Sequence, residues 1–229
     1  MRTLTAKIAG LVVVAGIIAA VWVGWGAPGA RAAAPLAPPT VDDALAPHAG
    51  RASIVLAGGC FWGVQLVFEH VRGVISATDG YAGGDASTAQ YDTVSTGRTG
   101  HAESVRVVYD PAQVTLGKLL QVFFSVATDP TEWNRQGPDE GTQYRSVIFY
   151  STPRQLEIGR DYIRQLQAAH AFGRPIVTEL TALSAARGFY PAEAYHQDYA
   201  RLHPYDTYIR LYDLPKLTAL RAQWPQLAR

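Results

Sequence analysis

The only cysteine of this 229-residue chain, Cys60, stands where a predicted strand gives way to a predicted helix. Residues 53–57 form a short apolar run that is typical of a strand, and apolar residues recur at mostly helical spacing from Phe61 onward. Gly58 and Gly59 allow a tight turn between the two elements. The pattern therefore places Cys60 at the start of a helix.

A cysteine at a helix start has two interpretations. Unpaired amide N–H groups and the positive end of the helix dipole favour the thiolate, which is the nucleophilic form. A lone cysteine is nevertheless more commonly a buried and inert side chain. Two large aromatic residues, Phe61 and Trp62, follow Cys60 and cannot both point into the core from one helix turn, so at least one ring should border an open site. This neighbourhood favours a reactive cysteine.

The composition fits one globular domain with an appendage. Hydrophobic residues make up 48% of the chain and charged residues 17%, as in ordinary globular proteins. The formal net charge is +1 and the two signs are interspersed. Because the sequence has no basic run or patch, we expect no nucleic-acid partner.

The N-terminus carries an export signature. Arg2 and Lys7 precede an uncharged stretch over residues 8–25, and the small residues 32–34 would suit a signal peptidase. The stretch exceeds the roughly 7–15 residues of a signal-peptide core and approaches the roughly 18 of a membrane span, so a cleaved signal and an uncleaved anchor both stay open. Basic residues before the stretch favour export of the domain that lies after it.

We therefore divide the chain into three parts: a signal peptide or membrane anchor over residues 1–27, an Ala/Pro-rich linker over residues 28–50 and a folded domain with a C-terminal tail over residues 51–229. The expected location is the periplasm or another extracytoplasmic space, either anchored to the membrane or secreted. Exported domains usually pair their cysteines, so a single unpaired cysteine there again favours a reactive thiol.

Beyond residue 50 the pattern alternates between strands and helices. Strands are predicted over residues 74–78, 103–109, 147–150 and 176–183, and helices over residues 116–126 and 153–170. This mixture predicts an α+β domain of two layers, with helices packed on one sheet.

Acids and phenols lie in segments where they could serve Cys60. Glu103 begins a predicted strand, Tyr91 lies in the glycine-rich loop before it, and Asp139 and Tyr144 lie in a later loop. Taken singly, each is more commonly a solvated or core residue. Their grouping in loops makes them candidates for a site around the cysteine.

Four ordered motifs carry a resemblance to a known family. They are Gly59-Cys60-Phe61-Trp62-Gly63, Gly100-His101-Ala102-Glu103, the twelve residues 135–146, and Phe189-Tyr190-Pro191-Ala192-Glu193 with Tyr195-His196-Gln197. Over about residues 53–205 the chain resembles the A-type peptide methionine sulfoxide reductases. The resemblance implies a two-layer α/β sandwich with a ferredoxin-like core, and an enzyme that selects the S epimer of the sulfoxide.

The resemblance also implies roles for the candidate residues. Cys60 would be the nucleophile and Glu103 the proton donor. Tyr91 and Tyr144 would donate hydrogen bonds to the sulfoxide oxygen. Asp139 would be a polar support of the site. An aromatic wall would surround the substrate methyl group: Phe61 and Trp62.

The chemistry explains why an acid must accompany the thiol. A sulfoxide sulfur is a poor electrophile until its oxygen is protonated or strongly hydrogen-bonded, and Glu103 can supply the proton near neutral pH only if burial raises its pKa. Attack releases methionine, protein-bound or free, and leaves Cys60 as a sulfenic acid. Many relatives carry further cysteines that resolve this acid. This chain has no further cysteine, so we expect an external thiol, thioredoxin-like or small, to regenerate Cys60. We also expect no bound cofactor.

Other interpretations of the sequence remain open. A thiol hydrolase would pair Cys60 with His101 or His196. A non-catalytic exported binding module would need Cys60 to be inert. The six histidines lack the close spacing of a metal site, so we expect no metal.

Overall fold

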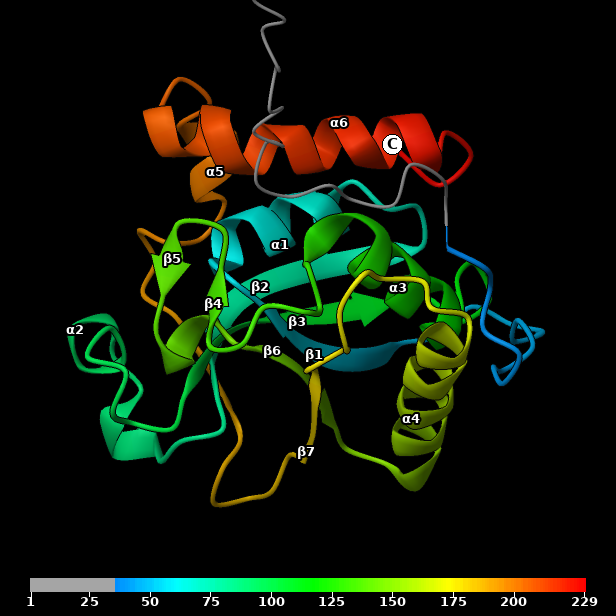
Figure 1. The fold of residues 1–229 in the computed structure, drawn as a ribbon, viewed down its shortest axis with the longest axis horizontal. Coiled ribbons are helices and arrows are strands. Elements are labelled where there is room, and N and C mark those ends of the chain that lie inside the picture. The colour runs from blue at the N-terminus through cyan, green and yellow to red at the C-terminus, as the bar shows by residue number, and fades with distance from the viewer. Residues whose placement is uncertain (1–35) are drawn as a thin grey trace, which may run out of the picture.

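The computed structural model describes residues 36–229, in which a mixed six-stranded sheet carries most helices on one face (Figure 1). The strand order is β7-β6-β1-β3-β2-β8, and only β6 and β7 pair in parallel. The strands are β1 (Ala52–Gly58), β2 (Val74–Ala82), β3 (Ala102–Tyr109), β6 (Ser146–Tyr150), β7 (Glu179–Ala182) and β8 (Phe189–Pro191). A separate hairpin pairs β4 (Arg135–Gln136) with β5 (Asp139–Glu140).

The helices of the described residues are α1 (Phe61–Glu69), α2 (Tyr91–Val94), α3 (Leu116–Val122), α4 (Pro153–Ala168), α5 (Tyr199–Leu202) and α6 (Leu214–Gln223). Two π-helical segments, Phe123–Ala127 and Ile209–Asp213, follow α3 and precede α6. Short 3₁₀ turns occupy Ala86–Thr88 and Thr142–Tyr144. The predicted α+β class is confirmed.

Side chains alternate across the sheet and so assign each candidate to a face. On β3, Val105 and Val107 belong to the main core beneath the helices, whereas Ala102 belongs to a smaller cluster on the opposite face. Because residues two apart share a face, Glu103 lies on the helix-covered side with Val105 and Val107. Its partner across the β2–β3 ladder is Tyr81. Strand alternation therefore puts the acid on the helix-covered face, and its hydrogen bond from the Phe61 N–H puts it beneath the start of α1.

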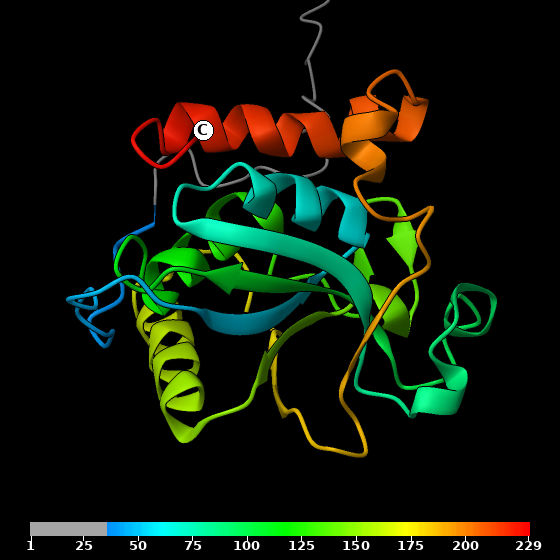
Figure 2. The same ribbon diagram turned by 180° about the vertical axis from the view of Figure 1, so that it is seen from behind.

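Helix α1 lies between the sheet and α6, as both views show (Figures 1 and 2). The sequence pattern assigned no element to the C-terminal tail, yet that tail forms α5, a π-helical segment and α6. The start of α1, the β4–β5 hairpin and α5 lie at one end of the sheet (Figure 2). The start of α1, directly after Cys60, and the C-terminal tail therefore lie at the same end of the sheet.

Most predicted elements are present with shifted bounds. The strand predicted over residues 74–78 runs on to Ala82, because Tyr81 and its neighbours pair with both β3 and β8. The helix predicted over residues 116–126 changes from α to π geometry at Phe123. The predicted leader, residues 1–27, lies outside the described residues. Within residues 36–229, no helix combines the length and apolarity that a membrane span requires.

Residues 36–43, here called the strap, lie along α3 and α4. The Leu36 side chain is buried and its carbonyl accepts a hydrogen bond from Gln121 of α3. The Ala37 carbonyl accepts from the Tyr162 hydroxyl at 2.9 Å. The Asp42 carboxylate accepts from the backbone N–H of Gly117 at 2.9 Å and from the hydroxyl of Thr115, the N-cap of α3. Residues 36–43 of the predicted linker are thus packed against the domain, and Asp42 completes the cap of α3.

Replacing Asp42 with alanine should destabilise the fold. Asp42→Ala leaves the Gly117 N–H without its acceptor, and loss of a helix cap costs about 1–2 kcal/mol of unfolding free energy. Urea denaturation measures the difference. The matched control is Asp43→Ala, because Asp43 is 55% exposed and pairs with Arg154 at the surface, where such a pair contributes about 0–1 kcal/mol. Equal losses in the two variants would contradict the capping role.

Candidate active site

The turn before α1 can be built only with glycine at residue 59. Gly59 has φ +95°, in the left-handed region that glycine adopts without strain. A Cβ atom there would also lie 2.5 Å from the side chain of Gln136, on strand β4. Cys60 follows as the N-cap residue of α1 and is 8% exposed. The predicted place of Cys60 at a helix start is confirmed.

The net effect of these surroundings on the thiol differs from the expectation of a stabilised thiolate. Burial, followed by the charges of Glu103 and Asp213, raises the pKa of Cys60 well above its ordinary value. The backbone N–H of Trp62 acts in the opposite direction, as the helix start predicts, but is the weaker influence. The free protein therefore holds Cys60 as a neutral thiol, and the expectation from the helix dipole alone was wrong.

Glu103 lies against the same helix start. Its Oε2 accepts a hydrogen bond from the Phe61 N–H at 3.1 Å, and the residue is 3% exposed. Burial raises the pKa of Glu103 to about 8, although the Phe61 N–H opposes the shift. At neutral pH the carboxyl group is therefore mostly protonated. The predicted raised pKa of the acid is confirmed.

Two phenols face the thiol and the acid from different loops. Tyr91 begins α2 and Tyr144 ends the 3₁₀ turn at residues 142–144. Burial first, and the charge of Glu103 second, raise the pKa of each phenol, and Cys60 contributes to both shifts. Both hydroxyl groups therefore remain neutral hydrogen-bond donors. Tyr91 and Tyr144 are thus near enough to Glu103 and Cys60 for the charges of these two groups to act on both phenols.

Asp139 joins the group through a residue that the sequence pattern did not reveal. The Tyr208 hydroxyl, at the start of the second π-helical segment, donates a hydrogen bond to Asp139 Oδ2. Burial, followed by the Cys60 charge, raises the pKa of Tyr208. Burial also raises the pKa of Asp139, against opposing contributions from Tyr208 and Lys216. Tyr208 is thus a third phenol near the thiol, and its position in the unassigned tail gave no signal.

The aromatic wall has one buried and one accessible ring. Phe61 is 1% exposed, and Trp62 is half-buried with its ring stacked on Tyr199 at 4.0 Å between centroids. Tyr208 meets Trp62 edge-on at 6.2 Å. The prediction that at least one of the two rings borders an open site is consistent with Trp62. Packing on α5 and the tail fixes that ring.

A buried ion pair brings the tail close to the first turn of α1. Lys216 Nζ lies 3.5 Å from Asp213 Oδ1, and both side chains are almost fully buried. A Cβ atom on Gly63 would lie 2.1 Å from that same Oδ1. Glycine at residue 63 therefore permits the close approach of the pair. Asp213 also contributes to the raised pKa values of Cys60 and Glu103.

The two histidines considered for a Cys–His pair have other partners. His101 accepts from the Gly84 N–H at Nδ1, at 3.2 Å, and lies 3.0 Å from the Asp85 carbonyl at Nε2. His196 accepts from Trp62 Nε1 at Nδ1, at 3.3 Å. Each imidazole is therefore hydrogen-bonded to a group other than the Cys60 thiol. Within residues 36–229, no cluster of three or more metal-ligating side chains occurs.

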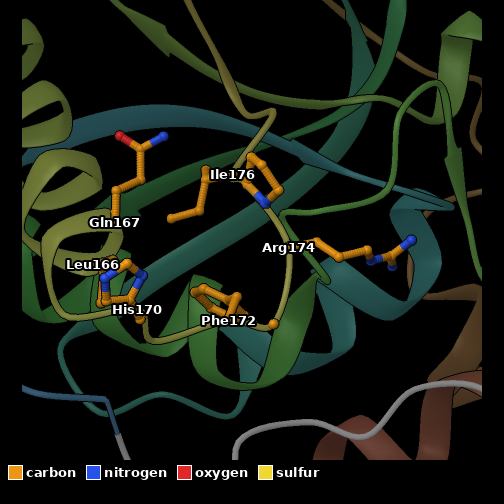
Figure 3. Close-up of a pocket in the computed structure, with 8 residues that line it drawn as sticks. Leu166, Gln167, His170, Phe172, Arg174 and Ile176 are labelled. Carbon is orange, nitrogen blue, oxygen red and sulfur yellow. The ribbon is translucent and has the colours of Figure 1, made fainter.

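A cavity of about 340 Å³ lies elsewhere, at the C-terminal end of α4 (Figure 3). Leu166, Phe172 and Ile176 line it with apolar side chains, and His170 and Arg174 add polar groups. None of the candidate residues around Cys60 lines this cavity. The candidate active-site residues around Cys60 and this cavity are therefore separate sites.

Comparisons with known proteins give one family for the chain. The chain matches the family model described as peptide methionine sulfoxide reductase over residues 52–228. It is 52% identical over 187 residues to peptide methionine sulfoxide reductase MsrA 2 of Mesorhizobium japonicum, covering 82% of this chain and 93% of the relative. It is 51% identical over 175 residues to the protein of the same name from Synechocystis, covering 76% and 80%.

Solved structures give the same family. The reduced form of Mxr1 from Saccharomyces cerevisiae aligns with a TM-score of 0.61 and 32% identity, covering 73% of this chain and 92% of that one. Methionine sulfoxide reductase A of Corynebacterium diphtheriae aligns with a TM-score of 0.59 and 40% identity, covering 69% and 77%.

The raised pKa of Glu103 should make stability depend on pH in a defined direction. Because burial raises this pKa from 4.5 to about 8, folding favours the protonated form, so the contribution to unfolding free energy is full below about pH 4.5 and is lost as pH rises through 8. Glu103→Gln removes that dependence. The variant should gain stability relative to wild type between pH 5 and pH 8.5, as measured by urea denaturation at both values.

The control for this measurement is Glu140→Gln, since the Glu140 side chain is 73% exposed. Its stability relative to wild type should stay the same at the two pH values. A Glu103→Gln difference that is equally independent of pH would show that Glu103 titrates normally.

Proposed function

The chain belongs to the peptide methionine sulfoxide reductase family as a peptide-methionine (S)-S-oxide reductase, and we propose that it works with one cysteine and an external thiol. The observation that carries the proposed mechanism is the protonated Glu103 carboxyl, bonded to the N–H of the residue directly after Cys60. Acid and nucleophile therefore share one helix start. Methionine sulfoxide in proteins is the substrate, and we extend the proposal to the free amino acid.

In the proposed reaction the sulfoxide oxygen points toward Glu103, Tyr91 and Tyr144. The two phenols stabilise the charge that develops on oxygen, as donors in an oxyanion hole do. The Cys60 sulfur attacks the sulfoxide sulfur while Glu103 gives its proton to the oxygen, and the thiol proton restores Glu103. The hydroxyl group then moves from the substrate sulfur to the Cys60 sulfur, so that the substrate S–O bond and the S–S bond formed in the attack both break as the Cys60 S–O bond forms. The products are methionine and one sulfenic acid, with no net uptake of protons.

The methyl group of the substrate lies against aromatic rings in this proposal. Phe61 and Trp62 supply apolar contact, and each sulfur–aromatic contact contributes about 0.3–1.5 kcal/mol. Asp139 supports the site through its hydrogen bond from Tyr208. The raised pKa of the free thiol is compatible with this order of events, because the Cys60 proton need leave only as Glu103 gives up its own.

Recycling is proposed to need two equivalents of an external thiol. The chain holds no second cysteine, so an intramolecular disulfide cannot form. The first thiol condenses with the sulfenic acid, releasing water and leaving a mixed disulfide. A second thiol then displaces Cys60 and leaves as a disulfide with the first. A thioredoxin-like protein or a small thiol would serve, without a bound cofactor.

We also propose the finer architecture and the location that the sequence indicates. The central order β6-β1-β3-β2, threaded β1-α1-β2-β3-α3-β6, supports a ferredoxin-like core. The pattern of residues 1–27 supports export to an extracytoplasmic space, by a cleaved signal or an anchor, with residues 28–50 leading into the domain. The intact mass of the mature protein from cells distinguishes cleavage from anchoring.

Two substitutions test the proposed nucleophile and acid. Cys60→Ser should abolish reduction of the S-sulfoxide, because no other thiol exists in the chain. Glu103→Gln keeps the shape of the acid but removes its proton, so the single-turnover rate at pH 7 should fall by roughly 10²–10⁴. A near wild-type rate in either variant would reject the role of that residue.

The fate of Cys60 tests the proposed recycling. With excess substrate and no reductant, each chain should form one methionine, and a dimedone-type reagent should trap Cys60 as a sulfenic acid. Turnover should resume when a thiol is added, at a rate that follows the nucleophilicity of that thiol. Non-reducing electrophoresis detects the competing product, a disulfide between the Cys60 residues of two chains. A disulfide-linked dimer that forms faster than the trapped species would reject the external-thiol scheme in favour of recycling between two chains.

A further inference from the structure

Glu193 makes two hydrogen bonds that reach into the proposed site from the segment after β8. Its Oε1 accepts from the backbone N–H of Tyr91 at 2.9 Å, and its Oε2 accepts from the Tyr81 hydroxyl at 2.8 Å. The Tyr91 N–H is the first of helix α2, whose N-cap residue, Gln90, makes no side-chain cap. Glu193 therefore satisfies a helix donor that the helix itself leaves open.

The charge of Glu193 suits this role. Burial opposes the charged form, but the N–H of Tyr91 and the Tyr81 hydroxyl outweigh it and lower the pKa of Glu193. An ionised carboxylate accepts hydrogen bonds more strongly than a neutral one. Tyr81 is in turn the β-ladder partner of Glu103, so the carboxylate is tied to the strand register of the acid.

His196 is hydrogen-bonded to the aromatic wall and lies near Glu193, but no hydrogen bond joins it to that carboxylate. The indole of Trp62 can only donate, so its 3.3 Å hydrogen bond to His196 Nδ1 requires Nδ1 to accept and puts the ring proton on Nε2. That Nε2 lies 3.9 Å from Glu193 Oε2. Burial lowers the pKa of His196, so the ring is neutral. It packs against Tyr91 at 4.6 Å between centroids.

We propose that Glu193 is a positioning residue that holds Tyr91 in fixed relation to Glu103. One carboxylate thereby aligns a donor to the sulfoxide oxygen with the acid that protonates it. It does so without touching the substrate. This inference rests on the roles proposed above for Tyr91 and Glu103.

The segment that carries Glu193 does not depend on Glu193 for its attachment. Gln197 accepts from the Asp79 N–H and donates to the Asp79 carbonyl, both at 3.0 Å. The Ala192 N–H also donates to the Asp79 carbonyl, at 2.9 Å. These bonds, two from the Gln197 side chain and one from the Ala192 backbone, hold the segment to β2 without Glu193. The contacts of Glu193 are therefore directed at the site rather than at anchoring the chain.

A double-mutant cycle separates positioning from general structure. Glu193→Gln keeps the size of the side chain but loses one acceptor and the charge, so the single-turnover rate on an S-sulfoxide peptide should fall by roughly tenfold. If Glu193 acts through Tyr91, then Tyr91→Phe should cost at least about fivefold less in the Glu193→Gln background than in wild type. Tyr144→Phe, which removes the phenol that Glu193 does not contact, should cost the same in both backgrounds.

Two further variants complete the experiment. Gln197→Ala should lower stability while leaving the rate constants of the folded enzyme unchanged. Glu193→Asp, which keeps the charge but shortens its reach, enters the same cycle if Glu193→Gln does not fold. Independent, multiplicative costs of the Glu193 and Tyr91 substitutions would overturn the inference. A Tyr91→Phe variant with the wild-type rate would instead reject the proposed role of Tyr91, and the inference with it.

Discussion

The hydrogen bond from the Phe61 N–H to the Glu103 carboxyl is the contact on which the rest of the site depends. It joins the helix start that carries Cys60 to strand β3, and it exists because β1 and β3 pair side by side in the sheet. The other site residues come from α1, the short helix α2, the segment of β5 and the following 3₁₀ turn, and the C-terminal tail. A shift of β3 by one residue would turn Glu103 to the opposite face, because side chains alternate along a strand. Strand register is therefore the first requirement of the chemistry.

Burial of this junction sets the proton positions. A thiol and a carboxyl in the same dry pocket both resist ionisation, so each keeps its proton in the free protein. The acid is thereby ready to donate at neutral pH, whereas the thiol must lose its proton during the reaction. The helix start alone would favour the opposite state of the thiol. Burial of Glu103 lowers the free energy of unfolding at alkaline pH, because its pKa is raised to about 8 and ionisation of the buried carboxyl is unfavourable.

The sequence predicts the place of a site residue where that place depends on neighbouring residues in the chain. It does not predict contacts between segments that are far apart in the chain. The sequence placed Glu103 at the start of a strand, and the glycine turn placed Cys60 at the start of α1. Their place in loops made Tyr91, Tyr144 and Asp139 candidates for a site around Cys60, and family resemblance supplied their roles. Tyr208 and the Asp213–Lys216 pair could not be predicted, because the tail reaches the site through packing between segments far apart in the chain.

The raised pKa of Cys60 illustrates the same limit. A strand–glycine–helix pattern predicts that Cys60 lies at the positive end of a helix dipole. The burial of the thiol depends on all the segments that pack against it, and the pattern does not predict these. Trp62 is a second example, since its hydrogen bond to His196 and its stacking on Tyr199 join segments more than 130 residues apart. The sequence identified the reacting groups, and the tertiary structure decides their protonation and orientation.

The protonation of Glu103 is the central claim, and infrared difference spectroscopy tests it directly. The spectrum of wild type minus that of Glu103→Gln isolates the carboxyl band of this residue from those of other buried acids. The account predicts a protonated-carboxyl band at pH 7 that disappears as pH rises through about 8. A Glu103 band that has already changed to the carboxylate form near pH 4.5 would contradict it.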